Sequence, residues 1–309
     1  FDIPALTAFA SADLSAQEQF WVMMAMLAGF AVKVPLFPVH TWLPLAHTEA
    51  PTAGSVVLAG VLLKLGTYGL FRFVLPMTPA GVVEAVPAIG TLATIGVIYG
   101  ALICWVQEDV KKLVAYSSVS HLGFCVLGLF ALNPSGLQGS ILYMINHGLS
   151  TGALFLLIGM IYERYHTRDM NRLGGLVTIM PIWSAFMVFF VLSSLAVPGL
   201  NGFVSEFLCL IGAFSATPDN AQWPGLLGPW YAVFAGTGMI LAAMYLLYLT
   251  GRLVWGPFRA PPADEKSGLP TDLSPREIGL LLPLAAMCIW LGVQPSGLMR
   301  TLEPSVERT

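Results

Sequence analysis

Five ionisable residues lie within or beside long apolar stretches of this sequence, where charged side chains are rare: Lys33, Lys64, His121, His147 and Glu206. A charge at the centre of an apolar phase such as a bilayer costs about 2.5–3.5 kcal/mol. Burial disfavours the charged form of lysine and glutamate, and histidine changes its charge near neutral pH. Side chains of these three types therefore suit a chain of proton-carrying groups joined by water.

A sodium pathway fits this set of residues less well. Hard cations prefer several oxygen ligands, and Glu206 is the one carboxylate placed centrally in an apolar stretch. We therefore expect protons to be the transported ion.

Four of the five residues also have a structural interpretation. His121 and His147 have serine, asparagine and threonine neighbours and could be packed histidines bonded to Ser, Thr or backbone. Lys33 is near the end of its apolar stretch and could extend to the membrane surface. Glu206 could interact with the dipole of a helix N-terminus. Lys64 is too central for such an explanation.

The composition indicates a membrane protein. Of 309 residues, 56% are hydrophobic and only 10% are charged, and the mean hydropathy is +0.77. A soluble domain has roughly 25% charged residues. The net charge of −3 leaves no basic surplus for nucleic acid.

The cysteines and glycines indicate no metal or cofactor site. The four cysteines are far apart in apolar segments, where we expect buried thiols, and no CxxC motif is present. The sequence also has no GxGxxG motif or P-loop. We therefore predict neither a metal site nor a cofactor site in this chain.

About eight segments reach the roughly 20 apolar residues that a spanning helix needs. They are residues 17–36, 51–76, 83–106, 111–132, 136–163, 181–215, 229–256 and 276–295. The fold class predicted is thus an all-α, polytopic helix bundle in a membrane.

Two of these spans should be broken. The first runs into Pro35 and Pro38, after which residues 38–49 should form a short half-helix or turn, and the sixth contains Pro198 and Gly199. Proline removes a helical hydrogen bond, and non-helical backbone at membrane depth needs protein or a hydrated cavity around it. The breaks therefore indicate polar interiors.

Basic residues predict the orientation of the spans. With residues before 17 outside, the inside connections are 37–50, 107–112, 163–180 and 256–275. The basic residues then inside are Lys111, Lys112, Arg164, Arg168, Arg172, Arg252, Arg259, Lys266 and Arg276, and those outside are Arg72, Arg300 and Arg308. This excess agrees with the tendency of Lys and Arg to stay in cytoplasmic loops.

Residues 30–69 read FAVKVPLFPVHTWLPLAHTEAPTAGSVVLAGVLLKLGTYG. This segment resembles the signature of the antiporter-like membrane subunits of respiratory complex I. Its spacing HxxAPTxxSxxLAxxLLKxGxYG is most similar to the chain M group (mitochondrial subunit 4) of NADH–quinone oxidoreductase. Further matches are QEDVKKLVAYSSVSHLGF at 107–124, YERYHTRDM at 162–170, PGLNGFVSEF at 198–207 and DLSPRE at 272–277.

The resemblance implies roles for the same residues. In this family, lysines matching Lys33 and Lys64 lie on a hydrated central axis. Histidines matching His121 and His147 connect two half-channels, and a carboxylate matching Glu206 follows the second helix break. The chain M group has glutamate there, whereas the other two groups usually have lysine.

The family fold also predicts how the chain divides. It has fourteen helices in two inverted five-helix repeats, each with one broken helix. Residues 1–76 would end the first repeat, residues 77–256 would form the second, and residues 257–309 would form a polar loop, a last span and a tail. The chain begins at Phe1 without a methionine, and the family's glutamate partner of Lys33 would precede it. We therefore expect an N-terminally truncated sequence.

The activity expected is proton translocation coupled to quinone reduction in other subunits of complex I. NADH, FMN, iron–sulfur clusters and quinone would bind those subunits. The partners expected are the other membrane subunits and the lipid bilayer. The location would be the bacterial inner membrane, or the mitochondrial inner membrane in a eukaryote.

Three other functions remain open at this point. A multisubunit cation/proton antiporter shares much of the pattern, although Glu206 and the HTRD sequence favour complex I. A structural membrane spacer would have inert polar groups at dry helix interfaces. A quinone-binding enzyme is the weakest alternative, because no paired donor site stands out.

Overall fold

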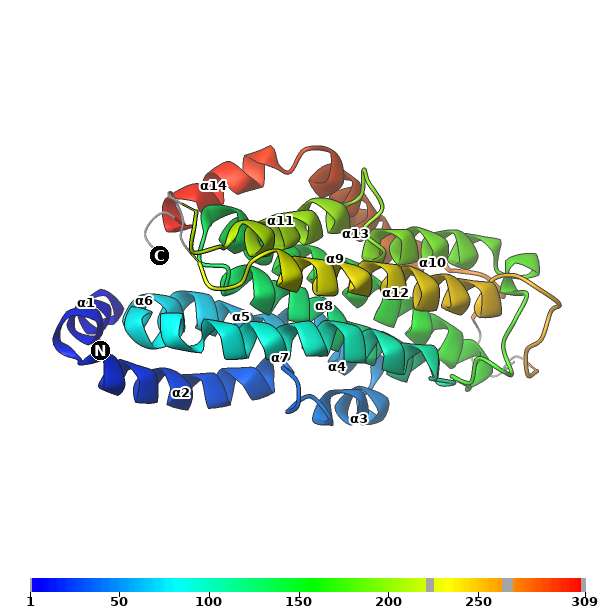
Figure 1. Ribbon diagram of the computed structural model, residues 1–309. Coiled ribbons are helices and arrows are strands. Elements are labelled where there is room, and N and C mark those ends of the chain that lie inside the picture. Colours follow the sequence, from blue (N-terminus) through cyan, green and yellow to red (C-terminus); the bar gives the residue numbers. More distant parts are fainter. Residues whose placement is uncertain (1, 221–224, 263–268, 307–309) are drawn as a thin grey trace.

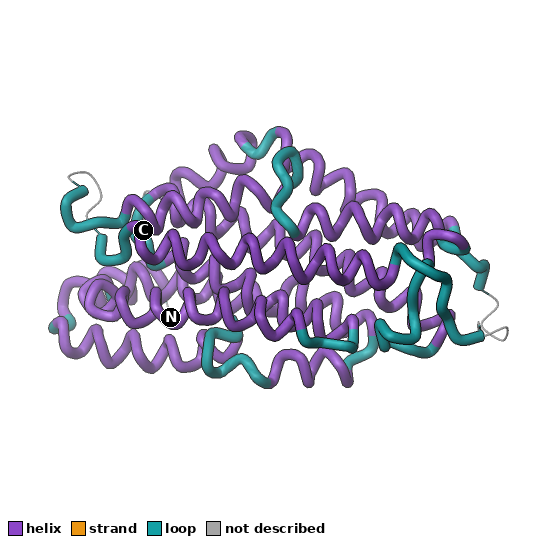
Figure 2. Tube along the Cα trace, turned by 45° about the vertical axis from the view of Figure 1, so that its right-hand side comes forward, coloured by secondary structure: helices purple, strands orange, loops and turns teal. Residues whose placement is uncertain are grey.

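The computed structural model describes residues 2–220, 225–262 and 269–306. Every regular element in this part of the chain is helical, and only isolated bridges join extended segments (Figure 2). The all-α prediction is confirmed. Lys266 and Arg308, which contributed to the charge count, lie outside the described residues.

Six long apolar helical segments run along the molecule. They are the segment Thr52–Met77, α7 (Pro79–Trp105), α8 (Val110–Leu129), α9 (Pro134–Tyr165), α12 (Pro229–Leu253) and α13 (Pro275–Val293). Each of these is long and apolar enough to cross a membrane. With α2 (Ala16–Lys33) and the paired half-helices α10 (Pro181–Ser194) and α11 (Asn201–Ser215), they account for the eight predicted spans.

Side-chain caps fix where several of these helices begin. The Asp109 carboxylate accepts the backbone N–H groups of Lys111 and Lys112 at the start of α8. Ser15 with Glu18 and Ser274 with Glu277 form reciprocal capping boxes at the starts of α2 and α13. These contacts satisfy N–H groups that have no partner within the helix.

Both helix breaks occur at the predicted prolines. Pro35 and Pro38 lie between α2 and the short helix α3 (Trp42–Glu49), whereas the expected half-helix began at residue 38. Pro198 and Gly199 lie between α10 and α11, and Gly199 has a φ of +93°. This left-handed conformation is one that glycine adopts without a steric penalty.

The segment Thr52–Met77 is less regular than the sequence indicates. It consists of α4 (Thr52–Val57), a π-helical turn η1 (Leu58–Leu62), α5 (Leu63–Gly69), a second π-helical turn η2 (Leu70–Val74) and α6 (Leu75–Met77). Wider π-helical turns of this kind occur frequently at functional sites. Here one of them directly precedes the turn that carries Lys64.

Three short helices were not predicted. Helix α1 (Ile3–Asp13) precedes α2, η3 (Leu176–Thr178) precedes α10, and α14 (Ser296–Val306) follows α13. In Figure 1, α1, α6 and α14 lie at the end of the molecule where both chain ends are found. Val306 of α14 is buried in the core, and Leu302 packs against it.

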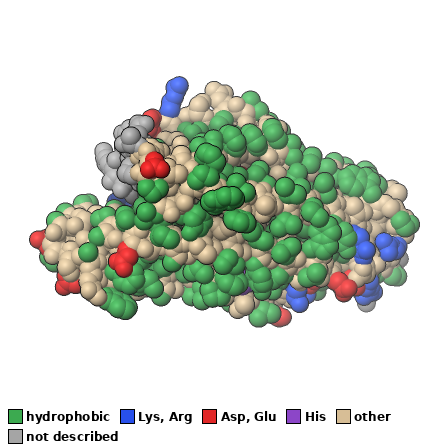
Figure 3. Space-filling view, in the orientation of Figure 1, with side chains coloured by type: hydrophobic (Ala, Val, Ile, Leu, Met, Phe, Trp, Pro, Cys, Tyr) green, Lys and Arg blue, Asp and Glu red, His purple; other side chains and the backbone are tan. Residues whose placement is uncertain are grey.

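Helices α8 and α9 form the centre of the bundle. Nearly every side chain of α8 and most of those of α9 are buried, whereas only a minority of those of α12 and α13 are. Figure 3 shows hydrophobic side chains along the length of the molecule and charged side chains gathered near its ends. Because His121 is on α8 and His147 on α9, the fold places both histidines away from lipid.

The connections predicted to share the inside come together at one end. Asp109 pairs with Asp169 and Gly174 with Arg259 in short antiparallel bridges. These bridges join residues 106–109, 166–180 and 254–262 into one layer, which we name the basic end. Described basic residues at or beside it are Lys111, Lys112, Arg164, Arg168, Arg172, Arg252, Arg259 and Arg276.

Candidate functional site

Lys64 and His147 are in direct contact in the interior of the bundle. The Lys64 ammonium lies 2.6 Å from Nδ1 of His147 and also donates to the carbonyl of Ala59, in the π-helical turn. This contact joins α5 to α9. When Lys64 donates to Nδ1, the hydrogen of the neutral imidazole is on Nε2, which has no partner among the described residues.

His147 and His121 lie close together and line the same small cavity. Their ring centroids are 5.5 Å apart. The cavity has a volume of about 10 Å³, and its polar lining includes Asn146, Ser193 and Ser194. That volume is about what one water molecule requires, so the cavity can connect the two imidazoles by a short proton path.

Tyr143 continues the polar chain from His121 to Glu206. Its phenol oxygen lies 2.7 Å from Nδ1 of His121 and 3.4 Å from Oε1 of Glu206. Tyr245 of α12 lies 3.2 Å from the other ring nitrogen of His121. Both tyrosines are buried, and neither was among the predicted site residues.

The second helix break is fixed to α9 by amide contacts. The Asn146 amide donates to the carbonyl of Asn201 and to Ser205 Oγ, at 2.6 and 3.0 Å. Asn201 returns a hydrogen bond to the carbonyl of Asn146 at 3.2 Å. These contacts fix the first turn of α11 and thereby position Glu206.

Four of the five predicted site residues therefore form one connected group. Lys33 is apart from it: this half-buried residue ends α2, and its side chain makes no hydrogen bond or ion pair with any described residue. Lys33 packs closely on Gly66 of α5. A Cβ added at Gly66 would lie 3.1 Å from Cβ of Lys33.

The serine neighbours of the two histidines bond to backbone carbonyls. Ser120 donates to the carbonyl of Val97 on α7, and Ser150 donates to the carbonyl of Asn146 one turn earlier on α9, as serines within helices often do. The partners of His121 and His147 come from other helices: Tyr143 on α9 and Tyr245 on α12 for His121, and Lys64 on α5 for His147.

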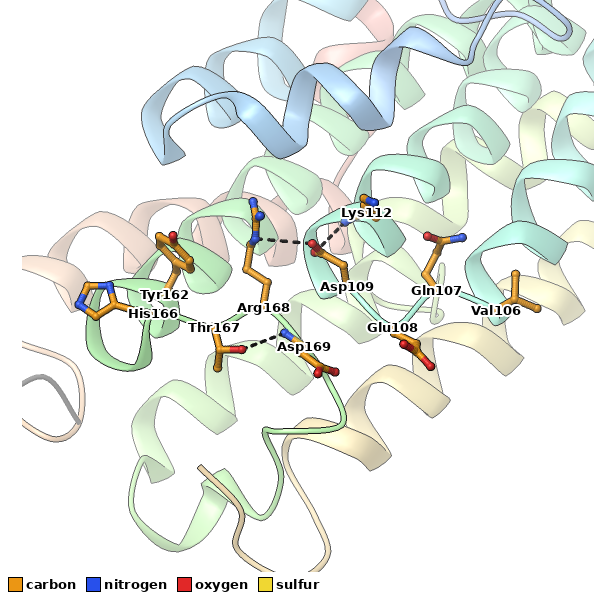
Figure 4. Close-up of a pocket in the computed structure, with 10 residues that line it drawn as sticks. All are labelled: Val106, Gln107, Glu108, Asp109, Lys112, Tyr162, His166, Thr167, Arg168 and Asp169. Carbon is orange, nitrogen blue, oxygen red and sulfur yellow. Dashed lines mark hydrogen bonds and ion pairs between the residues drawn. The ribbon is translucent and has the colours of Figure 1, made fainter. Parts of the chain in front are cut away.

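Two pockets lie at the basic end. The first, of about 580 Å³, is shown in Figure 4, where Asp109 connects the start of α8 with Arg168. Its lining residues are Val106, Gln107, Glu108, Asp109, Lys112, Tyr162, His166, Thr167, Arg168 and Asp169. The second, of about 640 Å³, includes Glu49, Lys111 and Glu163 in its lining and shares Tyr162 and Arg168 with the first. We name it the α3 pocket.

Basic side chains secure the C-terminal end of α3 beside this pocket. Lys111 Nζ donates to the carbonyl of Ala50 at 2.6 Å, and Arg168 donates to the carbonyl of Thr48 at 2.8 Å. The last carbonyls of a helix lack internal partners and carry partial negative charge. The two cations therefore stabilise the short helix that follows the first break.

A buried ion pair at the basic end was also absent from the sequence predictions. Arg164 of α9 forms two 2.8 Å bonds to the Glu277 carboxylate, and its remaining donors reach the carbonyls of Met160, Pro270 and Asp272. All five guanidinium donors are thus satisfied. The YERYHTRDM and DLSPRE motifs contain these two residues, so the motifs were the available signal.

The described residues contain no group of three or more His, Cys, Asp or Glu side chains that could hold a metal ion. All four cysteines are buried as free thiols, as expected. The side chains gathered at the site are lysine, imidazole, phenol and carboxylate groups, which can bind and release protons.

Long apolar helices, two helix breaks and a buried chain of ionisable groups define the class of the protein. It is a polytopic α-helical membrane protein with broken helices and ionisable groups buried in its interior. Residues 1–227 match the family described as NADH:quinone oxidoreductase/Mrp antiporter, TM. The chain belongs to this family.

Curated relatives share a large part of the sequence. NADH-quinone oxidoreductase subunit M of Rhodobacter capsulatus is 44% identical over 293 residues, which are 95% of this chain and 54% of the relative. NADH-ubiquinone oxidoreductase chain 4 of Marchantia polymorpha is 45% identical over 294 residues, which are 95% of this chain and 56% of the relative. The chain thus spans about half the length of these relatives.

Solved structures share the fold. Respiratory complex I from Thermus thermophilus matches with a TM-score of 0.86 and 33% identity, over 98% of this chain and 61% of that one. The archaeal membrane-bound sulfane sulfur reductase matches with a TM-score of 0.84 and 26% identity, over 97% and 48%. The Mrp complex from Dietzia sp. DQ12-45-1b has a TM-score of 0.82 and 20% identity, over 99% and 61%, and shares the fold alone.

Proposed function

We propose that this chain is part of a proton-translocating membrane subunit of NADH–quinone oxidoreductase, of the subunit M type. Protons would pass along Lys64, His147, His121, Tyr143 and Glu206, driven by quinone reduction in other subunits. The observation that carries the proposal is the continuity of this group: successive members are joined by hydrogen bonds or by the cavity between the imidazoles.

The helix breaks support the same function. The Asn146–Asn201 contacts position the break beside the cavity that both histidines line. Transporters place ion sites at such half-helix ends, because irregular backbone in a membrane supplies polar groups next to a cavity.

Lys33 would be a further proton station at the first break. Its side chain is free of partners in the described part of the chain, so it could pair with a carboxylate of the longer protein. In this proposal, residues 1–76 end the first inverted repeat, residues 77–256 form the second, and residues 257–309 add the last span and tail.

The rest of the machinery would lie in other subunits. The partners would be neighbouring membrane subunits and the lipid bilayer, in a bacterial or mitochondrial inner membrane. NADH, FMN, iron–sulfur clusters and quinone would bind elsewhere in the complex. This chain would contribute proton movement to the oxidoreductase and carry no redox group.

A subunit of a cation/proton antiporter is the second candidate, because the matching family includes Mrp antiporters. The sequence favours the first candidate: identity is 44% to a subunit M but 20% to a chain of an Mrp complex. A purely structural spacer is disfavoured by the cavity between His121 and His147, which both imidazoles line and which has about the volume of one water molecule.

The test uses the assembled, full-length complex in inverted membrane vesicles. Lys64→Ala should abolish or sharply reduce proton uptake per NADH oxidised while the complex still assembles. Lys112→Ala is the matched control, since Lys112 lies at the basic end outside the polar chain. Wild-type proton uptake in Lys64→Ala would overturn the proposal. Cation-dependent proton exchange in place of NADH-driven uptake would identify the antiporter instead.

A further inference from the structure

His47 is a fully buried histidine that the polar chain described above does not include. It lies on α3 with no exposed surface, and neither of its ring nitrogens has a hydrogen-bond partner among the described residues. Its ring stacks on Phe155, with centroids 4.4 Å apart and planes within 8°. Stacking occupies the ring face and leaves both nitrogen-bearing edges available.

Unsatisfied polar atoms in a protein interior are costly and rare. An apolar side chain of similar size could stack on Phe155 without that cost. A buried imidazole at this position therefore indicates a use for its nitrogens beyond packing.

His47 lies next to the α3 pocket and within electrostatic range of the polar chain. Thr48, the next residue, and Phe155, its stacking partner, both line the α3 pocket. The Lys64 ammonium and the His147 ring both interact electrostatically with the His47 ring. His47 is thus adjacent to the lining of the pocket and near the Lys64–His147 pair.

The α3 pocket has groups that can collect protons. The carboxylates of Glu49 and Glu163 are on exposed residues in its lining. Lys111 lies in the wall, with its ammonium fixed on the carbonyl of Ala50. Carboxylates at the mouth of a pocket attract and exchange protons with bulk water.

We propose that His47 is a proton relay that takes protons from the α3 pocket and passes them to the Lys64–His147 pair. The inference rests on the proposed function and adds the uptake step to it. A proton binds one ring nitrogen, the nitrogen on the other side releases its proton inward, and the ring is neutral again. No redox partner is required.

Burial and nearby positive charge favour passage of the proton through His47 over storage. Burial disfavours the charged ring most, and Lys111 and Lys64 add to this electrostatically. Like charges at short range destabilise an imidazolium. His47 would therefore hold a proton only briefly, and the charge state of Lys64 would determine when the proton passes on.

The test compares His47→Leu and His47→Gln with His40→Leu in the full-length complex in inverted vesicles. His40 is the matched control: it is buried in the same broken segment and its Nδ1 also has no partner among the described residues, but its ring packs on Phe37 and Tyr99, which line neither the α3 pocket nor the cavity between His121 and His147. The measurements are proton uptake per NADH oxidised, the rate of NADH oxidation with and without an uncoupler, and the amount of assembled complex.

We expect both His47 variants to assemble and to lose most proton uptake, and His40→Leu to retain it. Glutamine keeps polar atoms at the position but cannot carry a proton, so wild-type uptake in His47→Gln would overturn the relay. Failure of both variants to assemble, or an equal loss in His40→Leu, would show a packing role and also overturn it. Lys64→Ala, measured in parallel, separates the two proposals: normal uptake in that variant refutes the proposed function, whereas normal uptake in the His47 variants alone refutes only the relay.

Discussion

The phenol oxygen of Tyr143 lies 2.7 Å from Nδ1 of His121, and the same hydroxyl faces Glu206 at 3.4 Å. A phenol has one hydrogen to donate. When that hydrogen is directed to Glu206, the hydrogen between Tyr143 and His121 belongs to Nδ1, and Nε2 accepts from Tyr245. Tyr143 therefore couples the charge state of Glu206 to the tautomer of His121.

Tyr143→Phe tests this coupling. The change removes one oxygen and leaves the ring, so the complex should assemble while proton uptake per NADH falls sharply. A positioned proton-transfer group contributes roughly 10²–10⁴-fold to a rate. Nδ1 of His121 also loses its partner, which should lower the free energy of unfolding by about 1–3 kcal/mol.

Tyr245→Phe is the control. It removes the other hydrogen bond to His121 at a similar cost in stability, but it should retain proton uptake. Equal proton uptake in the two variants would contradict the assignment.

Glu206→Gln removes the charge of Glu206 but keeps its hydrogen bond with Tyr143. Glutamine can still accept the hydrogen bond from Tyr143, but it cannot bind and release a proton. We expect thermal stability close to that of the wild type, as judged by unfolding of the purified complex, and loss of proton uptake in vesicles. Glu84, an exposed carboxylate on α7, provides the control Glu84→Gln, which should pump normally. Normal pumping by Glu206→Gln would remove this residue from the pathway.

The helices and their breaks were predictable because their signals are local. Apolar runs of spanning length indicate helices, and Pro35 and Pro198 indicate where α2 and α10 must end. The ionisable site residues were also predictable, since a charge in an apolar run has to face the protein interior. The π-helical turn before Lys64 was not predictable, because no proline or glycine pattern distinguishes it from a regular turn.

The partners of the site residues depend on tertiary packing. Tyr143 and Tyr245 look like ordinary membrane-helix tyrosines in the sequence, and only the packing of α8 between α9 and α12 brings both to His121. His47 begins the HxxAPT motif, but the motif indicates no role for it, because its surroundings also depend on how the helices pack. Lys33 shows the opposite case: its position in the sequence suggested a place in the pathway, yet the described chain gives it no partner.

Gly148 should be intolerant of substitution because α9 meets the π-helical turn there at backbone distance. A Cβ on Gly148 would lie 2.7 Å from the carbonyl oxygen of Gly60 and 3.8 Å from Cε of Lys64. Gly148→Ala should therefore push the turn away and weaken the Lys64–His147 contact. Overpacking of this kind costs about 1–3 kcal/mol, measured as a lower unfolding temperature, and proton uptake should fall.

Gly152→Ala is the matched control on the same helix, one turn further along. Its added Cβ would meet only Val56, at 4.0 Å. We expect unchanged pumping and unchanged or slightly higher stability, because alanine favours helix over glycine by up to about 1 kcal/mol. Similar behaviour of the two alanine variants would show that the close approach at Gly60 is unimportant.

Arg164→Met should be among the most destabilising single changes at the basic end. The guanidinium is buried and pairs twice with Glu277. It also bonds the carbonyl of Met160 on α9 and two carbonyls, of Pro270 and Asp272, that join the end of α9 to the start of α13. Removing one partner of a buried ion pair costs about 3–5 kcal/mol, because the remaining charge stays buried without compensation. The unfolding temperature and the yield of assembled complex should both fall.

Arg276→Met is the control, since Arg276 is exposed and adjacent to Glu277. A surface change of this kind usually alters the free energy of unfolding by no more than about 0.5 kcal/mol. The double variant Arg164→Met with Glu277→Leu should recover part of the loss, because replacing a whole buried pair by apolar side chains is often neutral. If the double variant is no more stable than Arg164→Met alone, the carbonyl contacts rather than the uncompensated carboxylate account for the loss.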